Sequence, residues 1–227
     1  VCYNSKYIYV SDWKRVKIKI FDHNFKFIRG IGRKGEGPGE FKQIFADLKC
    51  DNRNFYILTI SYLHIFDKEG NFKKRILVDI LPRNFYLLKS KFLFRRIESP
   101  FAFYINDLNG KIIKKFYKKE KIYLKKCRES YSTPFAYLTN SNDFLVFNDL
   151  KYEIKVIDLN TYKTKKLIKR DVGFDSVRCK KMRIKNYELY SYDGGYSYMV
   201  EDKNNYYYFY WGKNKGNKID VYNKNFR

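Results

Sequence analysis

Short runs of aromatic and β-branched residues recur along the chain, and each run follows a polar turn. The runs are NSKYIYVSD (4–12), NRNFYILTI (52–60), KSKFLFRR (89–96), NSNDFLVFND (140–149) and KNNYYYFYW (203–211). Tyr, Phe, Ile and Val favour the pleated, half-buried surface of a β-strand, whereas Asn and Ser favour turns. The pattern therefore predicts five hairpins that begin near residues 4, 52, 89, 140 and 203.

Each hairpin is followed by a strand that usually ends at Asp or Asn. These segments are VKIKIFDHN (16–24), LHIFDKEG (63–70), FAFYINDLNG (101–110), YEIKVIDLN (152–160) and KIDVYNKN (218–225). Asp, Asn and Gly accept the backbone geometry of tight turns between antiparallel strands. A further strand follows, such as FKFIRGIG (25–32). The repeat is thus predicted to be a four-stranded antiparallel sheet, which is the unit of a β-propeller.

The glycine-rich stretch GRKGEGPGEF (32–41) raises the question of phosphate binding. It contains neither the Gly-Lys-Ser/Thr of a P-loop nor the G-x-G-x-x-G spacing of a dinucleotide loop, and the residues after it carry no helical apolar stripe. Glycine reaches positive φ at little cost, and Gly-Pro pairs favour turns. We therefore expect an architectural role for Gly32, Gly35, Gly37 and Gly39, with Glu40 accepting hydrogen bonds from backbone or Arg groups.

Residues 11–41, SDWKRVKIKIFDHNFKFIRGIGRKGEGPGEF, resemble a blade of NHL-type and related bacterial six-bladed β-propellers. The resemblance implies an all-β fold of four-stranded blades, in which the glycine stretch joins the outer strand of one blade to the inner strand of the next. Residues 1–227 would form a single propeller domain with about four and a half to five blades, incomplete at both ends. Residues 165–190 are expected to hold an insertion with a short helix.

The chain is strongly basic. It has 48 Lys and Arg against 24 Asp and Glu, a formal net charge of +24, which would attract polyanions. An AT-rich coding bias would explain part of this excess, because Lys, Asn, Tyr, Phe and Ile are over-used together. No apolar run is long enough for a transmembrane helix, and nothing in the sequence fixes the compartment. The resemblance alone favours a periplasmic, cell-surface or secreted location.

Cysteine and histidine provide no metal motif. Cys2, Cys50, Cys127 and Cys179 lie far apart, and their pairing stays open. His23 and His64 are the only histidines, and neither has a visible catalytic partner, so both are expected to be structural. We predict no catalytic residue, no metal site and no cofactor. The tyrosines of 206–211 are expected to pack in the core, because strand alternation sends them to both sheet faces.

Strand alternation also sorts the turns into two faces. We call "first face" the edge of the sheets that carries the turns between second and third strands and the loops into first strands. Its segments are basic and include aromatic residues that could stack on a ligand, while Arg can bind phosphate or carboxylate in a forked geometry. The candidate ligand-binding residues are Trp13, Lys14, Arg15, Arg33, Lys34, Arg95, Arg96, Lys151, Tyr152, Trp211 and Lys213. An ordinary solvated set of basic turns would give the same pattern.

Three functions follow as hypotheses. The first is a non-catalytic, extracytoplasmic binding module for a protein, glycan or other polar or anionic ligand. The second is an RNA- or polyanion-binding propeller, because some NHL propellers bind RNA through a basic face. The third is a propeller-based lyase or hydrolase, which the lack of a visible triad or metal cluster disfavours.

Overall fold

The computed structural model describes residues 1–42, 46–78, 82–96, 99–119, 121–122, 130–131, 134–141, 143–148, 152–169, 178–184, 187–193, 198–211 and 217–225. The chain separates into two compact units, Val1–Tyr117 and Lys118–Arg227. Within the described residues every regular element is a β-strand, so the all-β prediction is confirmed.

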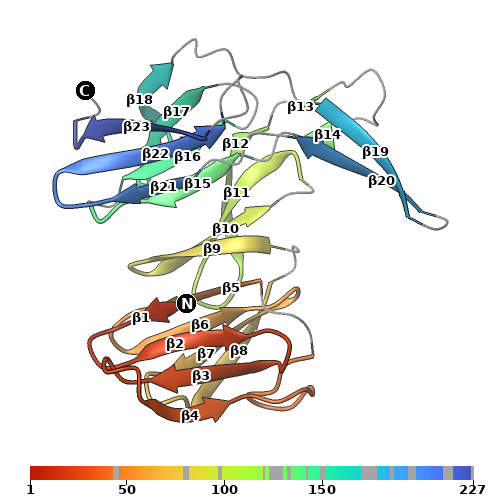
Figure 1. Cartoon of the computed structure of the whole chain (residues 1–227), viewed down its shortest axis with the longest axis vertical. Helices are drawn as coiled ribbons and strands as arrows, with labels where there is room; N and C mark the ends of the chain where they lie inside the picture. The colour runs from red at the N-terminus through yellow and green to blue at the C-terminus, as the bar shows by residue number, and fades with distance from the viewer. Residues whose placement is uncertain are drawn as a thin grey trace. The chain divides into compact units, whose positions relative to one another are not determined.

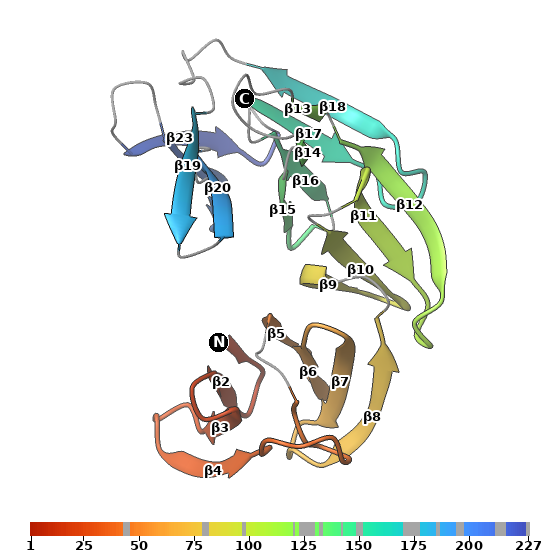
Figure 2. The ribbon, with the colours of Figure 1, turned by 90° about the vertical axis from the view of Figure 1, so that its right-hand side faces the viewer.

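The first unit consists of three four-stranded antiparallel sheets whose strands follow chain order (Figures 1 and 2). The first sheet contains β1 (Cys2–Tyr3), β2 (Ile8–Asp12), β3 (Lys17–Phe21) and β4 (Phe27–Ile31). The second contains β5 (Asp47–Cys50), β6 (Asn54–Leu58), β7 (Tyr62–Asp67) and β8 (Phe72–Leu77). The third contains β9 (Pro82–Leu88), β10 (Lys91–Arg96), β11 (Phe101–Asn106) and β12 (Ile112–Lys118).

The second unit contains one complete four-stranded sheet and three smaller ones. The complete sheet contains β15 (Phe135–Leu138), β16 (Phe144–Phe147), β17 (Glu153–Ile157) and β18 (Thr164–Lys169). A three-stranded sheet contains β21 (Tyr198–Glu201), β22 (Asn205–Trp211) and β23 (Asn217–Asn223). The two hairpins are β13 (Lys121–Ile122) with β14 (Ser130–Tyr131), and β19 (Arg178–Ile184) with β20 (Tyr187–Asp193).

The described part of the predicted insertion at 165–190 contains most of β18 and the hairpin of β19 and β20, and no helix. Residues 170–177, between β18 and β19, lie outside the described residues.

The middle strands of the second sheet are hydrophobic on both faces because this sheet packs between two cores. In β6, Phe55 and Ile57 contribute to the core shared with the first sheet, whereas Tyr56 and Leu58 contribute to the core shared with the third. Strand alternation sends successive side chains to opposite faces, so a sheet covered on both faces needs a continuous apolar run. In β22, Tyr206 and Tyr208 share one face and are buried, as predicted for the tyrosine run, whereas Tyr207 between them is only partly buried.

The outermost strands show the opposite pattern. Each of β8, β12 and β18 is largely exposed and carries three Lys or Arg residues. An edge strand presents unpaired backbone groups, and positive charge along it discourages pairing with another chain. Part of the basic excess therefore lies on the outer edges of the sheets and not on the first face.

Acidic and amide side chains organise the hairpin turns. Asp22, Asp67, Asp107 and Asp158 each follow a third strand and accept backbone N–H groups of the turn after it. Gly70 and Gly110 adopt positive φ in two of these turns. The predicted Asx-type turns are confirmed, because carboxylate oxygens replace backbone acceptors there.

A disulfide joins the first strands of two neighbouring sheets. Cys2 of β1 and Cys50 of β5 are bonded, with 5.9 Å between their Cα atoms and a sequence separation of 48. The sequence left this pairing open. Cys127 and the side chain of Cys179 lie outside the described part of the chain.

Candidate functional site

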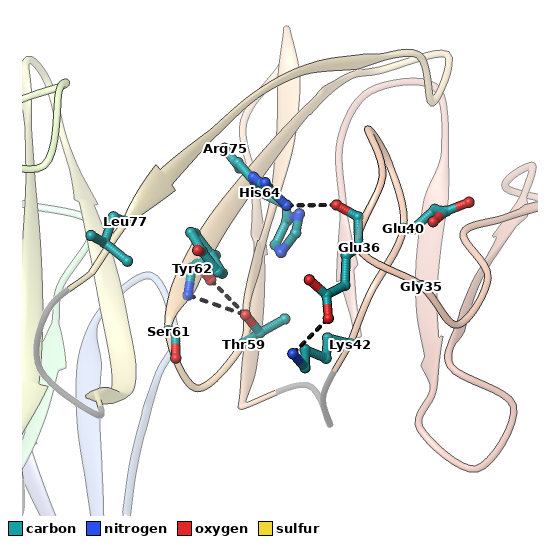
Figure 3. Close-up of a pocket in the computed structure, with 10 residues that line it drawn as sticks. All are labelled: Gly35, Glu36, Glu40, Lys42, Thr59, Ser61, Tyr62, His64, Arg75 and Leu77. Atoms are coloured by element: carbon teal, nitrogen blue, oxygen red, sulfur yellow. Dashed lines mark hydrogen bonds and ion pairs between the residues drawn. The ribbon is translucent and has the colours of Figure 1, made fainter.

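A pocket of about 310 Å³ lies at the first face of the first unit (Figure 3). It is lined by the glycine loop, the turn between β6 and β7, the start of β7 and the end of β8. The lining residues are Gly35, Glu36, Glu40, Lys42, Thr59, Ser61, Tyr62, His64, Arg75 and Leu77. Most of these side chains are polar, so the pocket suits a polar ligand.

The glycine loop forms one wall because it closes on itself. Arg33 O accepts the N–H of Phe41 at 2.9 Å, and Gly35 N–H donates to Phe41 O at 3.2 Å. Gly32 has φ +81°, and a Cβ added there would overlap the ring of Phe41, which is fully buried. The predicted architectural role of the loop is therefore explained by backbone geometry and close packing.

Glu40 stabilises this loop through interactions of its carboxylate. Its Oε2 accepts the N–H of Gly37 at 2.9 Å, and its Oε1 pairs with Arg33 Nε at 2.5 Å. The Gly37 N–H, followed by Arg33, lowers the pKa of the Glu40 carboxyl. A Cβ on Gly35 would overlap this carboxylate, so a larger residue there would displace the Glu40 side chain. Glu40 has the hydrogen-bonding role that the sequence predicted.

Two cations and one carboxylate meet at the mouth of the pocket. Lys42 Nζ lies 2.6 Å from Glu36 Oε1, and Arg75 Nη1 donates to the backbone O of Glu36 at 2.9 Å. Figure 3 shows Glu36 between the two cations, with its carboxylate directed toward Lys42. The hydrogen bond from Lys42 lowers the pKa of Glu36. Arg75 also lies over the ring of Tyr62, 4.9 Å from its centroid.

His64 forms the buried part of the lining. Its side chain is only 3% exposed, and its Nδ1 has no hydrogen-bond partner among the described residues. Burial, followed by the charge of Arg75, lowers the pKa of His64 to about 4. The imidazole is therefore neutral at neutral pH, so one of its ring nitrogens is a hydrogen-bond donor and the other an acceptor.

Among the residues that the structure describes, no candidate predicted from sequence lines this pocket. Trp13, Lys14 and Arg15 lie in the turn between β2 and β3, where Trp13 is 57% exposed and Arg15 pairs with Asp12 at 3.5 Å. Arg33 and Lys34 lie on the outside of the glycine loop and are exposed. These residues are at the first face, as predicted, but in separate turns.

Arg95 and Arg96 end β10 and are held by neighbours. Arg95 is 8% exposed, and its Nη1 donates to Asn84 Oδ1 at 2.9 Å. Arg96 lies over the ring of Tyr104, 4.6 Å from its centroid. Arg95 therefore stabilises the contact between β9 and β10, because a buried guanidinium needs such acceptors.

Tyr152 belongs to the core of the second unit. It is 3% exposed, and its hydroxyl bonds to Asp220 and, at 2.5 Å, to the hydroxyl of Tyr222. Burial and these two partners raise its pKa. Tyr152 therefore packs inside the unit instead of presenting a stacking surface. Lys151, Lys213 and the side chain of Trp211 lie outside the described residues.

Sequence reasoning missed Lys42, His64 and Arg75 as pocket residues. Lys42 follows the glycine loop, and Arg75 belongs to the basic run of an outer strand, so neither stands out in the sequence. Only the packing of the loop against β7 and β8 brings them together. Across the described ranges no group of three His, Cys, Asp or Glu residues could hold a metal ion, and no helix is long and apolar enough to cross a membrane.

These four-stranded antiparallel sheets, joined from the outer strand of one to the inner strand of the next, are β-propeller blades. The chain belongs to the DUF5128 family, described as a 6-bladed β-propeller, which it matches over residues 1–227. This shows the propeller fold predicted from the repeats. No curated protein sequence matches the chain.

Solved structures share this fold at low sequence identity. A candidate exported protein from Bacteroides fragilis NCTC 9343 is similar with a TM-score of 0.68 and 15% identity, over 99% of this chain and 68% of that protein. A protein of unknown function from Bacteroides caccae gives a TM-score of 0.61 and 10% identity, over 99% and 78%. The dihydro-heme d1 dehydrogenase NirN gives 0.54 and 13%, over 98% of this chain and 54% of its own. Such identities indicate fold and not function.

Proposed function

We propose that the protein is a non-catalytic binding module that recognises a polar, anionic ligand at the first face, outside the cytoplasm. The pocket beneath the glycine loop is the observation that carries this proposal. It combines the cations Lys42 and Arg75 at its mouth with a buried neutral imidazole, His64, in its lining. A concave site with a few convergent polar groups is the usual form of a ligand site.

Arg75 has the chemistry of an anion receptor. It forms no ion pair with a carboxylate of the described residues, and its guanidinium is held by a backbone carbonyl and by the ring of Tyr62. A guanidinium fixed in this way can donate to a carboxylate or phosphate without losing much side-chain entropy.

Three observations support a location outside the cytoplasm. The structurally similar Bacteroides fragilis protein is described as a candidate exported protein. The Cys2–Cys50 disulfide suits an oxidising compartment. Residues 11–41 resemble NHL-type and related bacterial propellers, and this resemblance favours the same location. Separately, the family match supports one propeller domain over residues 1–227.

Surface plasmon resonance on the full chain tests the function. The immobilised probes would be oligogalacturonate, polyglutamate and, as a neutral control, dextran. We expect at least one anionic probe to bind, and the variant Arg75→Gln to weaken that binding about tenfold or more, because a hydrogen bond to a charged group is lost. The matched variant Arg29→Gln removes a charge from the exposed edge strand β4, outside the pocket. Binding of no anionic probe, or equal losses in both variants, would refute the proposal.

RNA binding is a second candidate, favoured by the formal net charge of +24. Fluorescence anisotropy of a labelled single-stranded RNA across a salt series measures it. A steep salt dependence that is lost when Arg15 and Arg33 become Glu would support a polyanion-binding first face. If the RNA affinity is unchanged in this variant, the RNA does not bind through these first-face residues, and the basic outer strands would account for the binding.

A further inference from the structure

We propose that the pocket binds a small polyhydroxylated carboxylate, such as a sugar acid, and that the Glu36 carboxylate holds Lys42, one of the ligand's two cations, when no ligand is bound. This inference rests on the proposed function and specifies its ligand class. The geometry of three groups supports it: an anchored cation, a displaceable carboxylate and a buried imidazole.

Glu36 is placed to act as an internal competitor. Its carboxylate pairs with Lys42 across the pocket mouth, and both side chains are 69% exposed. An exposed ion pair of this kind contributes little to stability, so an incoming carboxylate can replace one partner at small cost. The backbone of Glu36 stays in place during the exchange, because its carbonyl accepts from Arg75 and its neighbour Gly37 is bonded to Glu40.

Lys42 and Arg75 give the site its preference for a carboxylate. Glu36 offers Arg75 only its carbonyl oxygen, so the guanidinium charge lacks a carboxylate partner among the described residues. A ligand carboxylate that displaces Glu36 would be shared by Lys42 and Arg75. Two cations on one carboxylate bind more strongly than one, since both contribute charge-assisted hydrogen bonds.

His64 and Ser61 give the site a preference for hydroxyl groups. His64 Nδ1 is closed to solvent and has no partner among the described residues, which is costly unless the ring turns toward the pocket and a ligand hydroxyl satisfies it. The hydroxyl of Ser61 makes no hydrogen bond to a described residue and lines the same pocket. The hydroxyl of Thr59 is already used, because it donates to Tyr62 O at 3.0 Å. A sugar hydroxyl can both donate and accept, so it matches a neutral imidazole in either tautomer.

The size and lining of the pocket favour a small polar ligand, or the end unit of a longer one. Its volume of about 310 Å³ lies at the small end of the range for ligand sites. Leu77 and the ring of Tyr62 are its main apolar surfaces. A six-carbon hydroxy acid is therefore a better match than a fatty acid or a cofactor.

Nuclear magnetic resonance of the imidazoles tests the ligand class directly. The chain contains two histidines, so a ¹⁵N-histidine-labelled sample of the full chain gives two spin systems. His23 lies in a turn of the first sheet, where its Nε2 bonds to Asn4 O, and serves as the internal control. We expect gluconate to shift the His64 ring resonances and leave those of His23 unchanged. Sorbitol, which has the same carbon skeleton without the carboxylate, should bind at least about tenfold more weakly, because the charge-assisted hydrogen bonds are lost.

The competitor role is tested with Glu36→Gln. Removing the competing carboxylate should tighten gluconate binding about two- to fivefold, the contribution expected of an exposed ion pair. Glu69→Gln is the matched control, because it removes the same charge from a surface pair with Lys68 in the same sheet, outside the pocket. Weaker or unchanged binding in Glu36→Gln, or equal tightening in both variants, would overturn the competitor role.

The outcomes separate this inference from the function beneath it. If polyglutamate binds at Arg75 but gluconate leaves His64 unshifted, the ligand class is wrong and the anion-binding function stands. If no anionic probe binds, both fail. If gluconate shifts both histidines equally, the effect is one of ionic strength, and the inference is rejected.

Discussion

The Cys2–Cys50 disulfide should contribute strongly to the stability of the first unit. The bond links β1 to β5 and encloses the whole first sheet within a loop of 48 residues in sequence. β1 itself has only two residues, so backbone pairing with β2 alone holds it weakly. The double variant Cys2→Ser, Cys50→Ser should therefore be less stable than the wild-type chain.

The magnitude follows from the loop length. A cross-link that closes a loop of this size removes conformational entropy from the unfolded chain worth about 4 kcal/mol, and measured effects run from about 2 to 4 kcal/mol. The loss should appear when urea unfolding is monitored by hydrogen exchange, as a lower free energy of unfolding for the amides of β1 to β8. Amides of the second unit serve as the internal reference.

Chemical reduction distinguishes the effect of losing the disulfide from the effect of the two serine substitutions. Dithiothreitol should lower the stability of the wild-type chain to that of the double variant and leave the variant unchanged. Trypsin cleaves after Lys6, Lys49 and Arg53, so a non-reducing digest should contain a cross-linked pair of short peptides carrying Cys2 and Cys50. Absence of that pair, or a stability difference below about 0.5 kcal/mol between oxidised and reduced chains, would refute the reasoning.

Three further outcomes are expected. The stability of the first unit should fall by roughly 3 kcal/mol as the pH drops from 6.5 to 4, because the unfolded chain protonates His64 while the buried ring, with its pKa of about 4 beside Arg75, resists. Gly32→Ala should cost about 2 kcal/mol or more through its positive φ and the Phe41 ring. Glu201→Gln should cost about 1 to 3 kcal/mol in the second unit, since this carboxylate accepts from three groups, including Lys224 Nζ at 2.5 Å.

Each outcome has its own check. His64→Phe should flatten the fall in stability between pH 6.5 and 4, and a slope unchanged by this variant would assign it to other groups. Gly30→Ala is the control for the glycine loop, because a Cβ there meets only Ile18 O, at 3.9 Å. Equal stability of the two alanine variants in urea would contradict the packing argument. For Glu201, a loss below about 0.5 kcal/mol would show that the buried charge is not needed.

The repeats made the fold predictable, whereas the site was not. Strand propensity, Asx turns and the glycine loop are local signals, and they placed the hairpins that begin near 4, 52, 89, 140 and 203 on the second strands of successive sheets. Candidate residues chosen because they are basic or aromatic turn residues had different outcomes. Trp13 and Arg15 are exposed, while Arg95 and Tyr152 are buried and bonded to neighbours. Burial depends on what packs above a turn, and sequence alone does not give it.

The sequence by itself determined the strand order and turn chemistry, because both depend on residues close together in the chain. Only the tertiary structure decided which distant residues meet. Packing of the glycine loop against β7 and β8 placed Lys42 and Arg75 on either side of Glu36, with His64 beneath them. Packing of the first sheet against the second paired Cys2 with Cys50. Long-range contacts of this kind arise from the burial of apolar faces between sheets, a non-directional force that leaves no local motif.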